Sequence, residues 1–140
     1  MKEILEMKRD IVIVMVHRVG KEFKEKFHDA QILALSGLLS HFGQTDGSPE
    51  DNLPQAPPFL ASLVAAVAVV TRILQAIKQR QTGIIRFSML HSVMYLGCFH
   101  LNSYFVGLTS GPRGTNILEG GAPFYRIYET KNSYICVGNI

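Results

Sequence analysis

The sequence contains no tryptophan and only two cysteines, with no Cys-x-x-Cys pair and no local cluster of histidines and cysteines. Since structural metal sites usually show such spacing, the sequence alone predicts no metal site. Cys98 and Cys136 both have apolar neighbours in the chain. We therefore expect two buried free thiols in a reducing compartment rather than a disulfide.

A strong excess of charge of one sign is also missing. The formal net charge is +3, and most of the basic residues are spread over positions 2–26 and 72–86 rather than gathered beside aromatic residues. This pattern argues against a nucleic-acid partner. The first ten residues carry charges of both signs and lack the apolar segment of a signal peptide, so no targeting signal is visible.

Long hydrophobic runs are absent as well. The longest, residues 59–70, is too short to span a bilayer and includes Ser62. A run of this length predicts a buried core helix rather than a membrane span. This helix is expected over residues 59–79, with Pro58 in its first turn and Gly83 as the signal that ends it.

What is present indicates one globular domain of the α/β class, since 47% of the 140 residues are hydrophobic and 18% are charged. The β-branched run at 11–16 predicts a strand buried on both faces, as in a parallel sheet flanked by helices. A second strand is expected at 84–90 and a helix at 91–106. Residues 125–137 predict two short strands joined by a turn at 131–133.

The stretch at 27–39, FHDAQILALSGLL, carries the first candidate chemistry. Asp29 is placed to cap a helix, and His28, Ile32, Leu35 and Leu39 fall at helical spacing on a face that favours burial. The positive end of a helix favours a neutral imidazole, which is the form a general base needs. A helix cap beside a surface histidine would give the same pattern, so the residues alone leave both interpretations open.

Two blocks in this order, HDAQILALSGLL and GPRGTNILEGGAPFYRIYET (111–130), resemble the α-methylacyl-CoA racemases of the family III CoA-transferase superfamily. That family carries a G-H-D-x-x-Y/F-x-A-L-S-G segment and a later P-R-G-x-N-x-L-x-G-G-A-P-F-Y segment. The resemblance implies a partial Rossmann-like large domain at 1–107, a linker at 108–124 and the start of a small domain at 125–140.

The resemblance also implies an activity, namely interconversion of (R)- and (S)-2-methylacyl-CoA thioesters in branched-chain fatty acid and bile acid metabolism. The substrate would be an acyl-CoA, with no cofactor, in a peroxisome or mitochondrion. His28 matches the catalytic histidine, Asp29 a supporting residue, and Gly120, Gly121 and Tyr125 a substrate-binding segment. A homodimer, or association with a full-length family member, is the implied assembly.

This chain departs from the family pattern at several positions. Racemisation needs a base and an acid on opposite faces of the α-carbon, and Leu60 stands where the family has the aspartate. Met15 replaces an arginine that the resemblance links to a CoA phosphate; His17 and Arg18 could substitute, or could form a solvated loop. Phe27 replaces a glycine. The alternative interpretation is therefore a catalytically inactive truncated homologue or a partial gene model.

Overall fold

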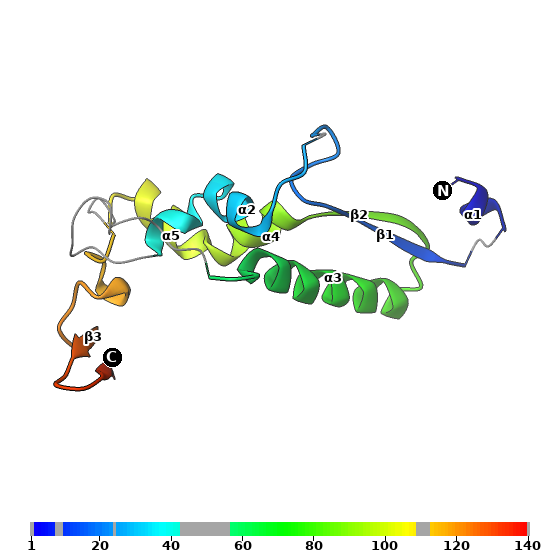
Figure 1. The fold of residues 1–140 in the computed structure, drawn as a ribbon. Coiled ribbons are helices and arrows are strands. Elements are labelled where there is room, and N and C mark those ends of the chain that lie inside the picture. Colours follow the sequence, from blue (N-terminus) through cyan, green and yellow to red (C-terminus); the bar gives the residue numbers. More distant parts are fainter. Residues whose placement is uncertain (1, 8–9, 24, 43–56, 109–112, 140) are drawn as a thin grey trace.

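The computed structural model describes residues 2–7, 10–23, 25–42, 57–108 and 113–139 (Figure 1). Helices and strands are both present along this length, which confirms the mixed helix and strand composition expected of an α/β protein. In chain order, the elements are α1 (Lys2–Met7), β1 (Val12–His17), α2 (Asp29–Leu35), η1 (Leu38–His41), α3 (Leu60–Lys78), β2 (Gly83–Ser88), α4 (Met89–Leu96), α5 (Cys98–Phe105), η2 (Ile117–Glu119), β3 (Tyr125–Glu129) and β4 (Tyr134–Gly138).

The predicted strands at 11–16 and 84–90 are confirmed as β1 and β2, which pair in parallel from Val12 opposite Gly83 to His17 opposite Ser88. Because parallel strands need a crossover connection, α2, η1 and α3 lie between them in the chain, and α3 runs alongside the pair (Figure 1). The expectation of burial on both faces is wrong: β1 is only partly buried and Val16 is exposed. A sheet of two strands leaves each strand with an unpaired edge.

The core is small and lies where α2, η1, α3 and α4 meet. Its fully buried members come from all four elements, and a second set of half-buried apolar side chains packs around them. Burial of these side chains is what holds the helices together. The buried members are Ile32, Leu33, Leu38, Ala61 and Val93.

The predicted helix at 59–79 is confirmed as α3, but both of its ends differ from expectation. Pro58 lies in a turn before the helix rather than in its first turn, and Phe59 adopts a left-handed conformation with φ of 59°. At the other end the left-handed residue is Arg80, and the Gln81 N–H donates to the Ala76 carbonyl at 2.8 Å. This is a Schellman-type ending without glycine; Gly83 instead begins β2.

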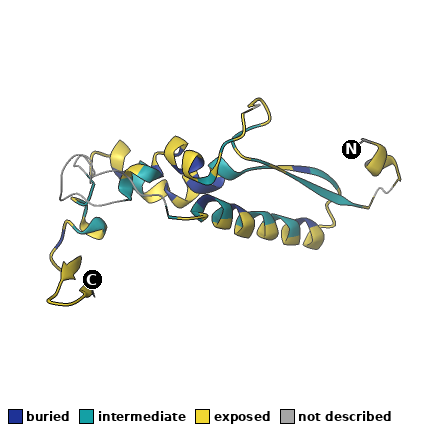
Figure 2. Cartoon of the chain, viewed as in Figure 1, coloured by how far each residue is buried: buried dark blue, intermediate teal, exposed yellow. Residues whose placement is uncertain are grey.

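The expectation that α3 is buried is wrong for one of its faces. Its small residues Ala61, Ala65 and Ala76 are buried, whereas five of its larger apolar residues form an exposed face that Figure 2 shows turned away from the strands. By length and composition alone α3 could cross a membrane, but one such helix is only weak evidence of a membrane span. We call the exposed face the apolar stripe; its members, each more than half exposed, are Leu63, Val67, Val70, Leu74 and Ile77.

The helix expected at 91–106 is two helices, α4 and α5, which meet at Gly97. The first of them starts two residues earlier than predicted because the Ser88 hydroxyl accepts from the His91 N–H at 3.3 Å and caps α4. Glycine is a poor helix former, and Gly97 both ends α4 and precedes α5.

The last described segment confirms the predicted hairpin: β3 and β4 pair antiparallel, from Tyr125 opposite Gly138 to Glu129 opposite Tyr134. Both cysteines are free, as expected, but the expectation of burial is wrong because Cys98 and Cys136 are exposed. Cys98 lies on α5 and Cys136 on β4, and each of these elements has a side exposed to solvent. Apolar neighbours in the sequence therefore did not lead to burial of the thiols. Of the expected linker at 108–124, positions 109–112 lie outside the described residues.

Candidate functional site

His28 lies immediately before the first turn of α2 and occupies the cap position of that helix. Its backbone N–H donates to the Gln31 side-chain oxygen at 2.7 Å, which fixes the start of the helix. The His28 side chain is exposed. The buried face of α2 is formed by Ile32 and Leu33, whereas Leu35, expected on that face, is exposed.

Asp29 caps a helix, but not its own. Its carboxylate accepts from the backbone N–H of Ala61 at 3.1 Å, from the N–H of Ser62 at 2.7 Å and from the Ser62 hydroxyl at 2.6 Å. These donors belong to the first turn of α3, where a negative charge is favoured by the helix dipole. Asp29 therefore fastens the start of α2 to the start of α3.

Leu60, at the position where the family resemblance led us to expect an aspartate, is the first residue of α3. Its side chain is partly buried and packs against the core. The neighbouring N–H groups of Ala61 and Ser62 are already bonded to Asp29. The place of the expected acid is thus filled by an apolar side chain that serves packing.

Gly120 and Gly121 have structural reasons to be glycine. Gly120 ends η2 with φ of 96°, a conformation that other residues rarely adopt. The Gly121 N–H donates to the Asn116 carbonyl at 3.0 Å, and a side chain at Gly121 would collide with the Thr115 carbonyl. Tyr125 begins β3, which Figure 1 places at one end of the molecule, away from α2. The structure therefore does not bring this segment beside His28.

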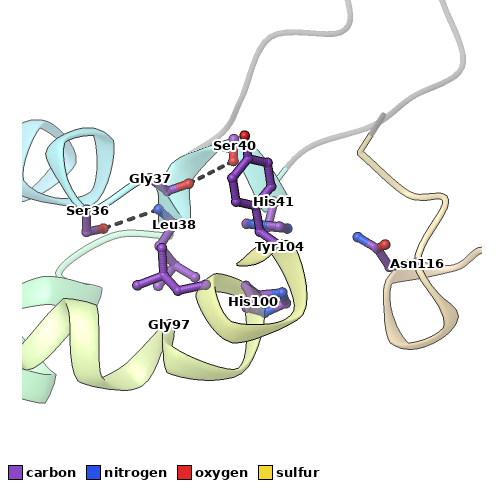
Figure 3. Close-up of a pocket in the computed structure, with 10 residues that line it drawn as sticks. Ser36, Gly37, Leu38, Ser40, His41, Gly97, His100, Tyr104 and Asn116 are labelled. Atoms are coloured by element: carbon purple, nitrogen blue, oxygen red, sulfur yellow. Dashed lines mark hydrogen bonds between the residues drawn. The ribbon is translucent and has the colours of Figure 1, made fainter. Parts of the chain in front are cut away.

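A cavity of about 290 Å³ lies between η1, α5 and the segment before η2. Figure 3 shows the rings of His41 and His100 one above the other on its wall, with Tyr104 beside them and Asn116 facing them from the later segment. The ring centroids are 4.1 Å apart and the rings are tilted by 31°. Two imidazoles from distant parts of the chain thus share one side of this cavity.

Both imidazoles contact the same carboxylate oxygen. Glu119 Oε1 lies 2.7 Å from His41 Nδ1 and 3.0 Å from His100 Nδ1, while Glu119 Oε2 accepts from the Asn116 side-chain N–H at 2.7 Å. The pKa of His100 lies below its ordinary value, mainly because the ring is partly buried and secondly because His41 is close to it. Glu119 acts in the opposite direction and raises this pKa. A neutral ring keeps a lone pair on one nitrogen.

A second cavity, of about 390 Å³, lies at the carboxyl end of β1 and is lined in part by His17, Arg18 and Glu25. The loop that forms it is held to the start of α4, because the Leu90 N–H donates to the Arg18 carbonyl at 3.0 Å. His17 Nε2 is buried and has no hydrogen-bond partner. Carboxyl ends of parallel strands are where α/β proteins commonly bind ligands.

Sequence reasoning did not single out His41, His100 and Glu119. His41 and Glu119 are 78 positions apart, so no short spacing signals their meeting. They meet only in the folded chain, where α5 lies beside η1 and η2 lies close to both of these helices. The earlier expectation of no metal site rested on the absence of a local cluster, a signal that cannot reveal a site assembled from three elements.

The chain belongs to CoA-transferase family III, whose family model matches residues 2–140. It is similar to proteins named alpha-methylacyl-CoA racemase: 35% identical to the one from Mus musculus and 32% identical to the one from Homo sapiens, each over 115 residues. These matches cover 81% of this chain and 30% of each relative. The chain thus spans less than a third of the length of the curated relatives it matches.

Proposed function

We propose that this chain acts on acyl-CoA thioesters as a racemase-like member of its family, exchanging the α-proton of a 2-methylacyl-CoA through His28. The observation that carries the proposal is the identity to proteins named alpha-methylacyl-CoA racemase, in a match to the family that includes the His28–Asp29 pair. The exposed side chain of His28 at the start of α2 supports it, because a general base must be reachable by its substrate.

In the proposed step, the neutral His28 imidazole takes the α-proton and leaves an enolate, then returns a proton to the same carbon. Because Leu60 cannot carry a proton, the chain has no acid at the family's position for the opposite face. We therefore expect exchange of the α-proton with retention, rather than the full interconversion of (R)- and (S)-thioesters.

The remaining parts of the proposal concern binding. The cavity at the end of β1 would take CoA phosphate groups, since Arg18 and His17 line it and Met15 cannot make such a contact. Gly120, Gly121 and Tyr125 would contact substrate only in an assembly that brings their segment beside His28. We assign residues 1–107 to a partial Rossmann-like large domain, 108–124 to a linker and 125–140 to the start of a small domain.

A second candidate is a catalytically inactive homologue that associates with a full-length family member or with a second copy. It is favoured by Leu60, which is committed to packing against the core, and by the distance of β3 from α2 in Figure 1. Under either candidate we place the protein in a peroxisome or mitochondrion and in branched-chain fatty acid or bile acid metabolism, as the family resemblance implies.

The test is deuterium wash-in at the α-carbon of 2-methylacyl-CoA in D₂O, with the purified full chain. His28→Ala should lower the exchange rate at least about 100-fold, whereas His91→Ala, which removes an exposed histidine on α4, should leave it unchanged. Chiral analysis should show retention in the wild type, and inversion only when Leu60→Asp restores a carboxyl group. Measurable exchange that is equal in wild type and His28→Ala removes His28 from catalysis. No exchange in either overturns the proposal and favours the second candidate.

A further inference from the structure

The cluster formed by His41, His100 and Glu119 has the composition of a metal site. Its three potential ligand atoms lie within 4.8 Å of one another, and all three side chains are partly buried. Two imidazoles and one carboxylate are a ligand set typical of zinc and similar divalent ions in sites that keep a fourth position open. Neither the proposed acyl-CoA chemistry nor its residues use this cluster.

We propose that His41, His100 and Glu119 bind one divalent transition-metal ion of the zinc type, with the fourth position open to the cavity beside Tyr104. The ion would be held by Nδ1 of each histidine and by a carboxylate oxygen of Glu119. Each nitrogen already faces the carboxylate, at 2.7 Å and 3.0 Å.

The geometry needs only small adjustments to accept the ion. Tetrahedral zinc with bonds near 2.1 Å places its ligand atoms about 3.4 Å apart. The carboxylate oxygen would move outward by about half an ångström. The two rings, stacked with centroids 4.1 Å apart, would rotate about their side-chain bonds. A neutral ring that donates a hydrogen bond from Nδ1 must carry its proton on Nε2 instead before Nδ1 can bind the metal.

The surroundings of Glu119 resemble those of a ligand held by an outer hydrogen bond. The side chain is 10% exposed, and its second oxygen accepts from Asn116, which orients the carboxylate towards the two histidines. Outer partners of this kind tune metal affinity. Asn116 is therefore a positioning residue for the site.

Binding would also fasten separate parts of the chain. The cluster joins η1, α5 and η2, and Arg113 adds a hydrogen bond from its Nε–H to the Ser40 carbonyl at 2.9 Å. A metal that bridges residues far apart in sequence stabilises the folded chain against unfolding. The ion would thus hold the segment that leads into the β3–β4 hairpin against the helical part.

The experiment is isothermal titration with ZnCl₂ on the full chain, metal-free at the start. Because Cys98 and Cys136 are exposed thiols and rival zinc ligands, the titration is done in the wild type and in a Cys98→Ser, Cys136→Ser variant. Both should bind one equivalent. On the variant background, His41→Ala, His100→Ala and Glu119→Gln should each weaken binding by at least about ten-fold, and Asn116→Ala by about ten-fold.

His91→Ala is the matched control, since it removes an exposed histidine outside the cluster, and it should leave zinc affinity unchanged. Far-ultraviolet circular dichroism confirms that each variant keeps its helices before titration. Substitution of Co²⁺ for Zn²⁺ gives a second readout, because the visible absorption of a four-coordinate cobalt site should vanish in His100→Ala. Zinc binding that persists in both histidine variants, or that disappears with the cysteines alone, overturns the proposal.

Discussion

At the scale of single residues, Asp29 shows how one side chain serves two elements. It is the first residue of α2, yet its carboxylate binds the first turn of α3, where it accepts hydrogen bonds from two backbone N–H groups and from the Ser62 hydroxyl. The contact joins helices whose first residues are about thirty positions apart. Asp29 therefore contributes to tertiary structure more than to the helix that contains it.

Asp29→Ala should lower the free energy of unfolding by about 1–2 kcal/mol, because the first turn of α3 loses its cap. Urea denaturation followed by circular dichroism measures the change. Asp29→Asn, which keeps an acceptor oxygen, should lose less. Asp10→Ala, which removes an exposed carboxylate, should stay within about 0.5 kcal/mol of the wild type; an equal loss in Asp29→Ala and Asp10→Ala would contradict the capping role.

Residue-level reasoning from the sequence recognised that Asp29 caps a helix and failed to find which one. A cap is inferred from residues next to it in the chain, and the donors here belong to Ala61 and Ser62. The same limit applies to His41, His100 and Glu119, which have no common motif and meet only through the fold. His28 and its neighbours were accessible to sequence reasoning because they form a continuous block.

At the scale of elements, the strongest patterns were the ones that predicted well. The β-branched run gave β1, the apolar run gave α3 within one residue at each end, and the turn residues at 131–133 separated β3 from β4. The errors arose where a local signal was assigned to the wrong element. Gly83 was taken as a helix stop, whereas the left-handed position that ends α3 belongs to Arg80.

Arg80→Gly should raise the free energy of unfolding by about 0.5–1 kcal/mol. A left-handed conformation costs a residue with a side chain about 1–2 kcal/mol, and the greater freedom of glycine in the unfolded chain offsets part of that gain. Thermal denaturation measures the shift. The matched control is Ala66→Gly on the exposed side of α3, which should lose about 1 kcal/mol; a loss in both variants would show that Arg80 makes a compensating contact.

At the scale of the whole molecule, the distribution of apolar surface is uneven. The core is confined to the junction of α2, η1, α3 and α4, while the apolar stripe along α3 remains exposed (Figure 2). The composition of this segment predicted a buried helix because it is rich in apolar residues. Composition does not indicate which face of the helix the rest of the chain covers. In the described structure Ala61, Ala65 and Ala76 face inward, whereas the apolar stripe faces out.

The native full chain should therefore bind the dye ANS through the apolar stripe. Replacing Val67 and Leu74 together by Gln should lower ANS fluorescence by at least about half, since an exposed apolar patch is what the dye senses. The control replaces Ile127 and Ile135, exposed residues of the hairpin, and should have a smaller effect. A cooperative urea transition in each variant shows that the dye reports the native surface, and undiminished fluorescence in the first would contradict the assignment.

The bond between Asp29 and α3 has an electrostatic consequence for any chemistry near His28. Two helix starts meet there, and each could in principle have steadied a developing negative charge with its open amides. One of them is already neutralised, because Asp29 holds the amides of Ala61 and Ser62. An enolate formed beside His28 would meet a fixed carboxylate where a pair of donors would otherwise stand, so removal of Asp29 alters both the fold and the charge that the intermediate encounters.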